Sequence, residues 1–149
     1  MKANQCREWL MNAMRAISCF QQSSATGDAR YKVFSLYDPA MLLEYSSTLA
    51  PPVCGITYAG MSSETDAVAQ GNSGRLSFGI LVTLASRERK VLARDTDIYV
   101  TEVLDAMRNA VRNKISPTQH VWVFQGEFPL DLGDRGLMYV QNWRTQVQL

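Results

Sequence analysis

The chain has 149 residues, 46% hydrophobic and 19% charged, which fits a single domain over residues 1–149 with a sizeable core. Its 15 Lys and Arg residues against 14 Asp and Glu residues give a net charge of +1. This balance excludes a strong global field for attracting nucleic acid or an acidic membrane. The three cysteines form no C-x-x-C pair, which argues against a zinc site or a disulfide framework: Cys6, Cys19 and Cys54.

The first residues of the chain lack the apolar run of a signal peptide, because charged and polar residues interrupt positions 1–8. No stretch approaches the ~18 apolar residues of a transmembrane helix. We therefore expect a protein made and kept in the cytosol, with no membrane partner. Apolar residues at spacings of three and four then predict a helix over residues 4–20, with Asn4 as its N-cap.

Alternating residues predict a short strand over residues 31–37. Asp38 followed by Pro39 predicts the start of a short helix that extends to about residue 47. A second strand is expected over residues 53–59. The polar, glycine-bearing stretch 60–74 that follows has no apolar period and is interpreted as an exposed loop.

The clearest strand pattern covers residues 75–85, where every second residue is large and apolar and the others are small or neutral. A charged connector over residues 86–94 leads into the best helix pattern, capped by Thr96 or Asp97 and extending to about Lys114.

The C-terminal part of the chain has the pattern of a hairpin. Residues 120–124 are expected to form one strand, residues 127–135 a connection, and residues 137–149 the last strand. The element order predicts an α+β fold. In it, a mainly antiparallel sheet packs against the N-terminal helix and the long central helix in a two-layer sandwich.

Catalytic patterns are weak throughout the chain. The single histidine, His120, begins an apolar strand and is interpreted as a residue at the sheet margin. An enzyme reading would have to use it with Glu127 and Asp131, the one local cluster of titratable groups. Glycines 71 and 74 lead into a strand, whereas a phosphate-binding loop leads into a helix. We therefore expect no catalytic residues, no cofactor and no metal site.

Contacts with other proteins are the expected function of several residues. Charge in the 86–94 connector suits a contact loop that meets an acidic partner, although a solvated loop is the simpler interpretation. The polar loop 60–74 is the other candidate. Two hairpin tryptophans are left open between core and interface. The candidate interface residues are Arg87, Arg89, Lys90, Arg94, Met61, Glu64, Asp66, Trp122 and Trp143.

Over almost its full length, the chain resembles the tail terminator proteins of long-tailed bacteriophages in the order of its predicted elements and in their residue patterns. The resemblance rests on the N-terminal helix 4–20, the proline-led strand 52–58, the polar loop from Gly60, the strand 75–82, the helix 100–111 and the closing hairpin. It implies a homohexameric ring that caps the tail tube, ends tube polymerisation and offers a surface to the head connector or stopper protein. DNA would only pass through the ring. The implied location is the tail–neck region of the virion, with assembly in the host cytoplasm.

Other functions remain open at this point. The chain could instead form another ring of the neck or baseplate, such as a head–tail stopper, which the sequence barely distinguishes from a tail terminator. A small dimeric α+β enzyme or a bacterial adaptor belongs to a different class and could share the fold.

Overall fold

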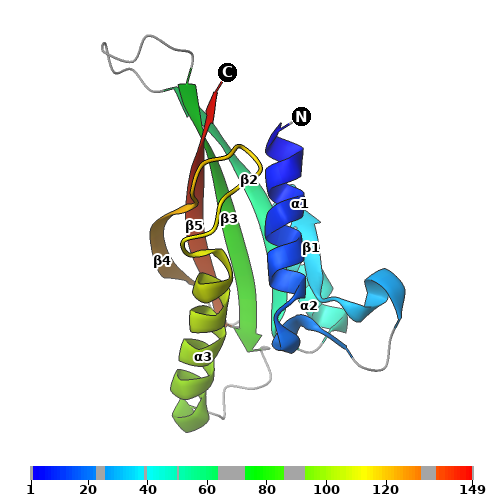
Figure 1. Ribbon diagram of the computed structural model, residues 1–149. Helices are drawn as coiled ribbons and strands as arrows, with labels where there is room; N and C mark the ends of the chain where they lie inside the picture. The colour runs from blue at the N-terminus through cyan, green and yellow to red at the C-terminus, as the bar shows by residue number, and fades with distance from the viewer. Residues whose placement is uncertain are drawn as a thin grey trace.

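A computed structural model describes residues 2–22, 26–38, 40–49, 51–63, 73–85, 93–131 and 137–148. Its centre is a five-stranded sheet with strand order β1-β2-β3-β5-β4 (Figure 1). The first pair, β1 and β2, is parallel, and every other neighbouring pair is antiparallel, which confirms the mainly antiparallel α+β prediction. The strands are β1 (Val33–Leu36), β2 (Val53–Ser63), β3 (Ser73–Ala85), β4 (Val123–Asp131) and β5 (Leu137–Gln148).

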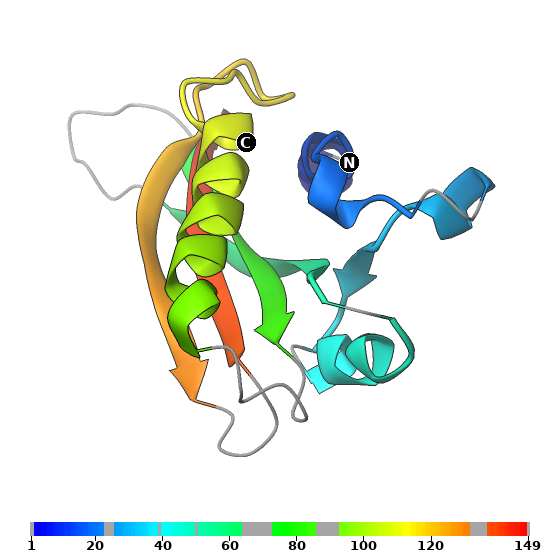
Figure 2. The same ribbon diagram turned by 90° about the horizontal axis from the view of Figure 1, so that it is seen from below.

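Helices lie on both faces of the sheet (Figure 2). The helices α1 (Lys2–Arg15) and α3 (Ala93–Val111) cover one face, where their apolar side chains share a core with Phe78 and Trp143. The remaining α-helix, α2 (Ala40–Thr48), packs on the opposite face with Leu81 and Val140 and forms a second core. The prediction of a two-layer sandwich is therefore incomplete, because both faces of the sheet carry apolar residues and each is covered over part of its area.

Two predicted helix starts are wrong by a few residues. The first helix begins at Lys2, so Asn4 lies inside it, and it ends at Arg15, with a separate 3₁₀ turn over Ser18–Phe20. The long helix begins at Ala93, so Thr96 and Asp97 lie in its first turns. The cap at Asp38 is confirmed, because its Oδ1 accepts a hydrogen bond of 3.0 Å from the Ala40 N–H.

Two segments interpreted as connections are paired strands. The register between β2 and β3 continues to Ser63 and Gly74, so only residues 64–72 of the expected loop lie outside the described part of the chain. In β4, Glu127 and Asp131 pair with β5. Backbone pairing stabilises the polar ends of β2 and β3 without apolar alternation. In β4, Pro129 and the acidic residues on either side gave the stretch the composition of a turn.

Gly55 is required where β2 passes beneath the side chain of Leu36. A Cβ at position 55 would lie 2.2 Å from Leu36 Cδ1 and 2.7 Å from its Cγ, and Leu36 is buried. We expect Gly55→Ala to lower the free energy of unfolding by about 1–3 kcal/mol through overpacking. Denaturant unfolding would measure it, with the double variant Gly55→Ala, Leu36→Ala as the control. If the clash is the cause, the double variant loses less stability than the sum of the two single variants.

Candidate assembly surface

His120 and Glu127, two of the three titratable groups of the enzyme interpretation, have different surroundings in the described part of the chain. His120 lies on the segment before β4, whereas the Glu127 carboxylate on β4 bonds to Arg108 and Gln141, and the Asp131 side chain lies outside the description. The described residues contain no group of three or more His, Cys, Asp or Glu side chains placed to hold a metal ion. None of the helices in the described ranges is long and apolar enough to cross a membrane.

The cysteines have the environment of core residues. Burial raises the pKa of the Cys6 thiol to about 11, against weaker lowering effects of a hydrogen bond with Ser116 and the charge of Lys2. Burial also raises the pKa of Cys19 and, more strongly, that of Cys54. The thiol form therefore dominates at neutral pH, which is opposite to what a nucleophilic cysteine requires.

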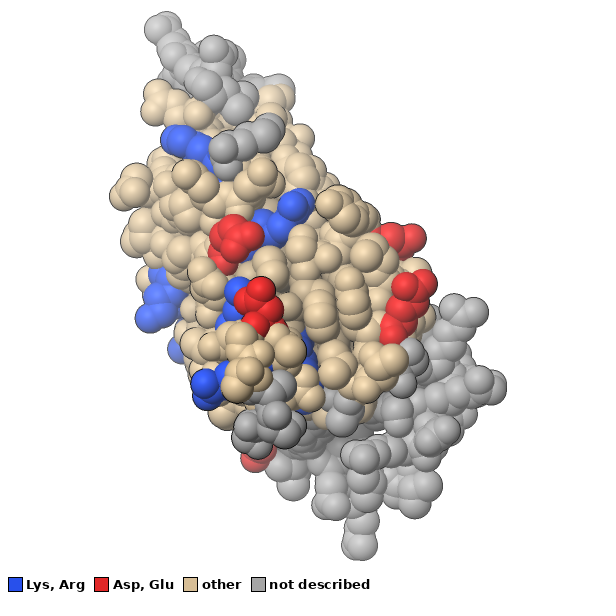
Figure 3. Space-filling view, turned by 90° about the vertical axis from the view of Figure 1, so that its right-hand side faces the viewer, with Lys and Arg blue, Asp and Glu red and all other residues tan. Residues whose placement is uncertain are grey.

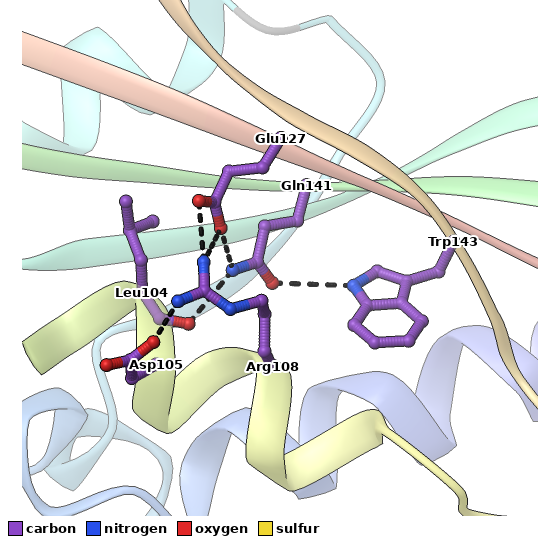
Figure 4. Close-up of polar contacts among 6 residues, drawn as sticks. All are labelled: Leu104, Asp105, Arg108, Glu127, Gln141 and Trp143. Atoms are coloured by element: carbon purple, nitrogen blue, oxygen red, sulfur yellow. Dashed lines mark hydrogen bonds and ion pairs between the residues drawn. The ribbon is translucent and has the colours of Figure 1, made fainter. Parts of the chain in front are cut away.

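A polar network joins α3 to the edge strand β4 (Figure 4). Nη1 of Arg108, on α3, donates to both Glu127 carboxylate oxygens at 2.5 and 2.6 Å. Gln141, on β5, donates from Nε2 to Glu127 Oε1 at 2.7 Å and to the Leu104 carbonyl at 3.1 Å. Three elements therefore meet at one carboxylate, and the side chain of Glu127 is fixed on the helix-covered face of the sheet.

Charge and burial make this network a structural clamp. Burial acts to lower the pKa of Arg108, but hydrogen bonds with Glu127 and Asp105 outweigh it and raise the pKa, so the guanidinium stays charged. Gln141 is fully buried, and its Oε1 accepts from Trp143 Nε1 at 3.4 Å. The groups of the network satisfy one another, which leaves no substrate site among them.

We expect Glu127→Gln to lower the free energy of unfolding by about 1–2 kcal/mol, because it removes a charge-assisted pair that is only partly exposed. Asp105→Asn is the matched control: Asp105 contacts the same arginine from one turn earlier on α3 but is largely exposed. Its loss should stay within about 0.5 kcal/mol. Equal losses in urea unfolding of the two variants would show that Glu127 does not clamp β4.

A bulge in β4 decides which side chains face outward. The register shifts between Phe124 and Gly126, and Gly126 has φ 139°, a conformation that side chains rarely adopt. Before the bulge, Phe124 faces the helices and contacts Trp143 with ring centroids 5.0 Å apart. After it, Glu127 turns towards the helices and Phe128 turns to the opposite face, here called the outer face.

Exposed apolar side chains gather along this edge of the sheet. Phe128 is 42% exposed and Phe124 41%. Among the described residues, β4 pairs only with β5, and Pro129 is the kind of residue that an edge strand tolerates. Large apolar groups beside an unpaired strand edge are typical of protein–protein contact surfaces. We call this surface the β4 strip and define it by Ile115, Val121, Val123, Phe124 and Phe128.

The structure separates the predicted interface residues. Trp122 and Trp143 are 3% and 1% exposed in the core of the chain itself, which favours the core over the interface for these two indoles. Trp122 packs between Trp9 and Phe78, with ring centroids 5.6 and 5.8 Å away.

The other predicted interface residues give a different result. Met61 is exposed near the end of β2, which agrees with an interface role without testing it. Five further positions, and the side chain of Arg94 at the start of α3, lie outside the described part of the chain: Glu64, Asp66, Arg87, Arg89 and Lys90.

The sequence pattern did not reveal Phe128 as part of an edge strand, because residues 127–135 were interpreted as a connection. Phe124 was placed in the predicted strand 120–124, but without a role at an interface. Pro129 next to Phe128 was the available signal, since proline within an apolar strand indicates an edge position.

On the side of the molecule shown in Figure 3, Lys, Arg, Asp and Glu are scattered among a larger uncharged area. Contacts on this side would rely on shape and uncharged groups more than on one strong field.

Comparison with known proteins identifies the fold. No protein-family model matches the chain, and no curated protein matches its sequence. Among solved structures, a chain in the virion of a native gene transfer agent particle is similar, with a TM-score of 0.60 and 14% sequence identity. The similarity covers 99% of this chain and 98% of that one. At this identity the match shows a shared fold over the full length of both chains.

Proposed function

We propose that this chain is a structural protein of a phage-like virion and forms a homohexameric ring that caps the tail tube. In this reading the ring ends tube polymerisation and presents a joining surface to the head connector. The observation that carries the proposal is the full-length fold similarity to a chain of a gene transfer agent virion. The location is then the tail–neck region of the particle, after assembly in the host cytoplasm.

The exposed edge of the sheet supports a function in assembly with other subunits. A closed ring repeats one heterologous contact by rotation, so each subunit needs two different surfaces that fit one another. The β4 strip offers one such surface, because it combines an unpaired strand edge with exposed aromatic side chains. The clamp between Arg108 and Glu127 holds that edge against α3, so the surface is formed before a neighbour arrives.

Tail length is the direct test of the capping role. Particles produced without this protein should carry overlong tails that lack heads, and supplying the wild-type chain should restore uniform tails, as measured by negative-stain electron microscopy. Tails of normal length that fail to join heads would instead identify a head–tail stopper. Normal, joined particles would overturn both ring assignments.

A further inference from the structure

A small basic cavity opens on the outer face of the sheet, beside the start of β4. Its volume is about 140 Å³, well below the ~300–1,000 Å³ of pockets that hold whole small molecules. The space therefore suits one functional group of a larger partner. Two guanidinium groups, an imidazole, an amide and two valines line it: Arg75, Arg144, His120, Gln146, Val121 and Val123.

The sheet register places the two arginines side by side. Arg75 pairs with Gln146, and Ser77 pairs with Arg144, so Arg75 and Arg144 are diagonal neighbours on β3 and β5. Both lie on the face opposite α1 and α3, because the alternate residue Leu76 lies in the core under those helices. The two arginines therefore place two positive charges beside the same cavity. Arg144 forms no ion pair or hydrogen bond through its side chain with any other described residue.

Buried hydroxyl groups hold in place the segment before β4 that carries His120 and lines the cavity. Ser116 Oγ lies 2.7 Å from Oγ1 of both Thr118 and Thr145, and all three residues are buried. Thr145 Oγ1 donates to the His120 carbonyl at 3.2 Å, and the Thr118 hydroxyl donates to the Gln146 carbonyl at 2.6 Å. These bonds fix the segment that carries His120 against β5, so the cavity is formed in the isolated chain.

We propose that this cavity binds a carboxylate group from an acidic segment of a partner protein. The planar Arg144 guanidinium matches the two oxygens of a carboxylate, and the positive charge of Arg75 adds to the attraction. The walls formed by Val121 and Val123, which belong to the β4 strip, suit the apolar atoms next to an Asp or Glu side chain in a peptide. Hydrogen bonds to a DNA backbone come from charged and polar groups and would leave these apolar walls unused.

The inference deepens the assembly proposal and rests on it for the nature of the partner. Carboxylate binding itself is measurable on the isolated chain, so the two proposals fail separately. His120 is the single histidine, which makes its ring resonances an unambiguous reporter in the cavity wall. Acetate and inorganic phosphate would be titrated separately at constant pH and ionic strength, with chloride as the exchanged anion.

We expect the His120 resonances to shift saturably with acetate. Arg144→Gln should weaken acetate binding about tenfold, because one charge-assisted donor is lost. Arg144→Lys should give an intermediate value, and its retained charge guards against a folding defect in the first variant. Arg112→Gln, which changes an exposed arginine just after α3, is the matched control and should bind acetate like wild type.

Three results would overturn the proposal. The first is a linear, unsaturated response to acetate. The second is saturable binding that Arg144→Gln leaves unchanged. The third is saturable binding of phosphate alone, which would assign the cavity to a phosphate group instead. If acetate binds as expected but the chain never assembles with tail tubes, the carboxylate site stands and the ring proposal fails.

Discussion

Trp143→Ala should lower the free energy of unfolding by about 3–5 kcal/mol, the largest stability loss expected of a single substitution in this chain. Trp143 is 1% exposed and pairs with Phe78 on β3 and with Phe124 on β4. Its removal leaves a cavity between the sheet and the helices and also removes the donor to Gln141. Most of that volume cannot be refilled, because its walls belong to three strands held in register.

Chemical denaturation monitored by circular dichroism would measure this loss. Trp143→Phe keeps an aromatic ring and should lose much less stability than the alanine variant. Tyr37→Ala, at a side chain that is 90% exposed, should change the free energy of unfolding by no more than about 0.5 kcal/mol. A loss below about 1 kcal/mol for Trp143→Ala would contradict the core position of this indole.

Phe128→Lys should abolish ring formation and tube binding while leaving the fold intact. Phe128 faces the outer side of the edge strand, and the Glu127 clamp and Trp143 lie on the other side of the sheet. A charge at the centre of an apolar contact would have to be buried without a partner when a neighbouring subunit docks. The loss of binding should be about thirtyfold or more, because aromatic residues at such positions contribute about 2 kcal/mol or more.

Tyr37→Lys is the matched control for this prediction. It introduces the same charge at an exposed aromatic residue directly after β1, the strand at the opposite edge of the sheet. The control should keep both the unfolding temperature and tube co-sedimentation of the wild-type chain. If Phe128→Lys still co-sediments with tubes, the β4 strip is not an assembly surface.

Regular apolar patterns made much of the fold predictable. The strand over β3 follows from its strict alternation, and the helices follow from spacings of three and four residues. The Asp38 cap was readable because the cap is local: its oxygen bonds to a backbone group two residues away. In each of these cases the residues that carry the signal are also the residues that make the contact.

The candidate surface was much less predictable, because it depends on register. One extra residue at the bulge before Gly126 exchanges the faces of the sheet to which Glu127 and Phe128 point. The alternation of side chains in the sequence does not reveal this bulge. The partner of Glu127 is 19 residues earlier in the chain, and only the packing of α3 over the sheet brings Arg108 to it. Trp122 and Trp143 stayed open between core and interface for a different reason. Tryptophan suits either environment, and only packing decides between them.

The mass of the protein in solution, measured by light scattering coupled to size exclusion, shows whether the chain forms a ring. The measurement would be made alone and then with purified tail tubes, with electron microscopy of the tube ends. We expect either a hexamer of the 16.7 kDa chain or a monomer that forms rings only on tube ends. A stable dimer that ignores tubes would contradict it and would make an enzyme or adaptor the better reading of this fold.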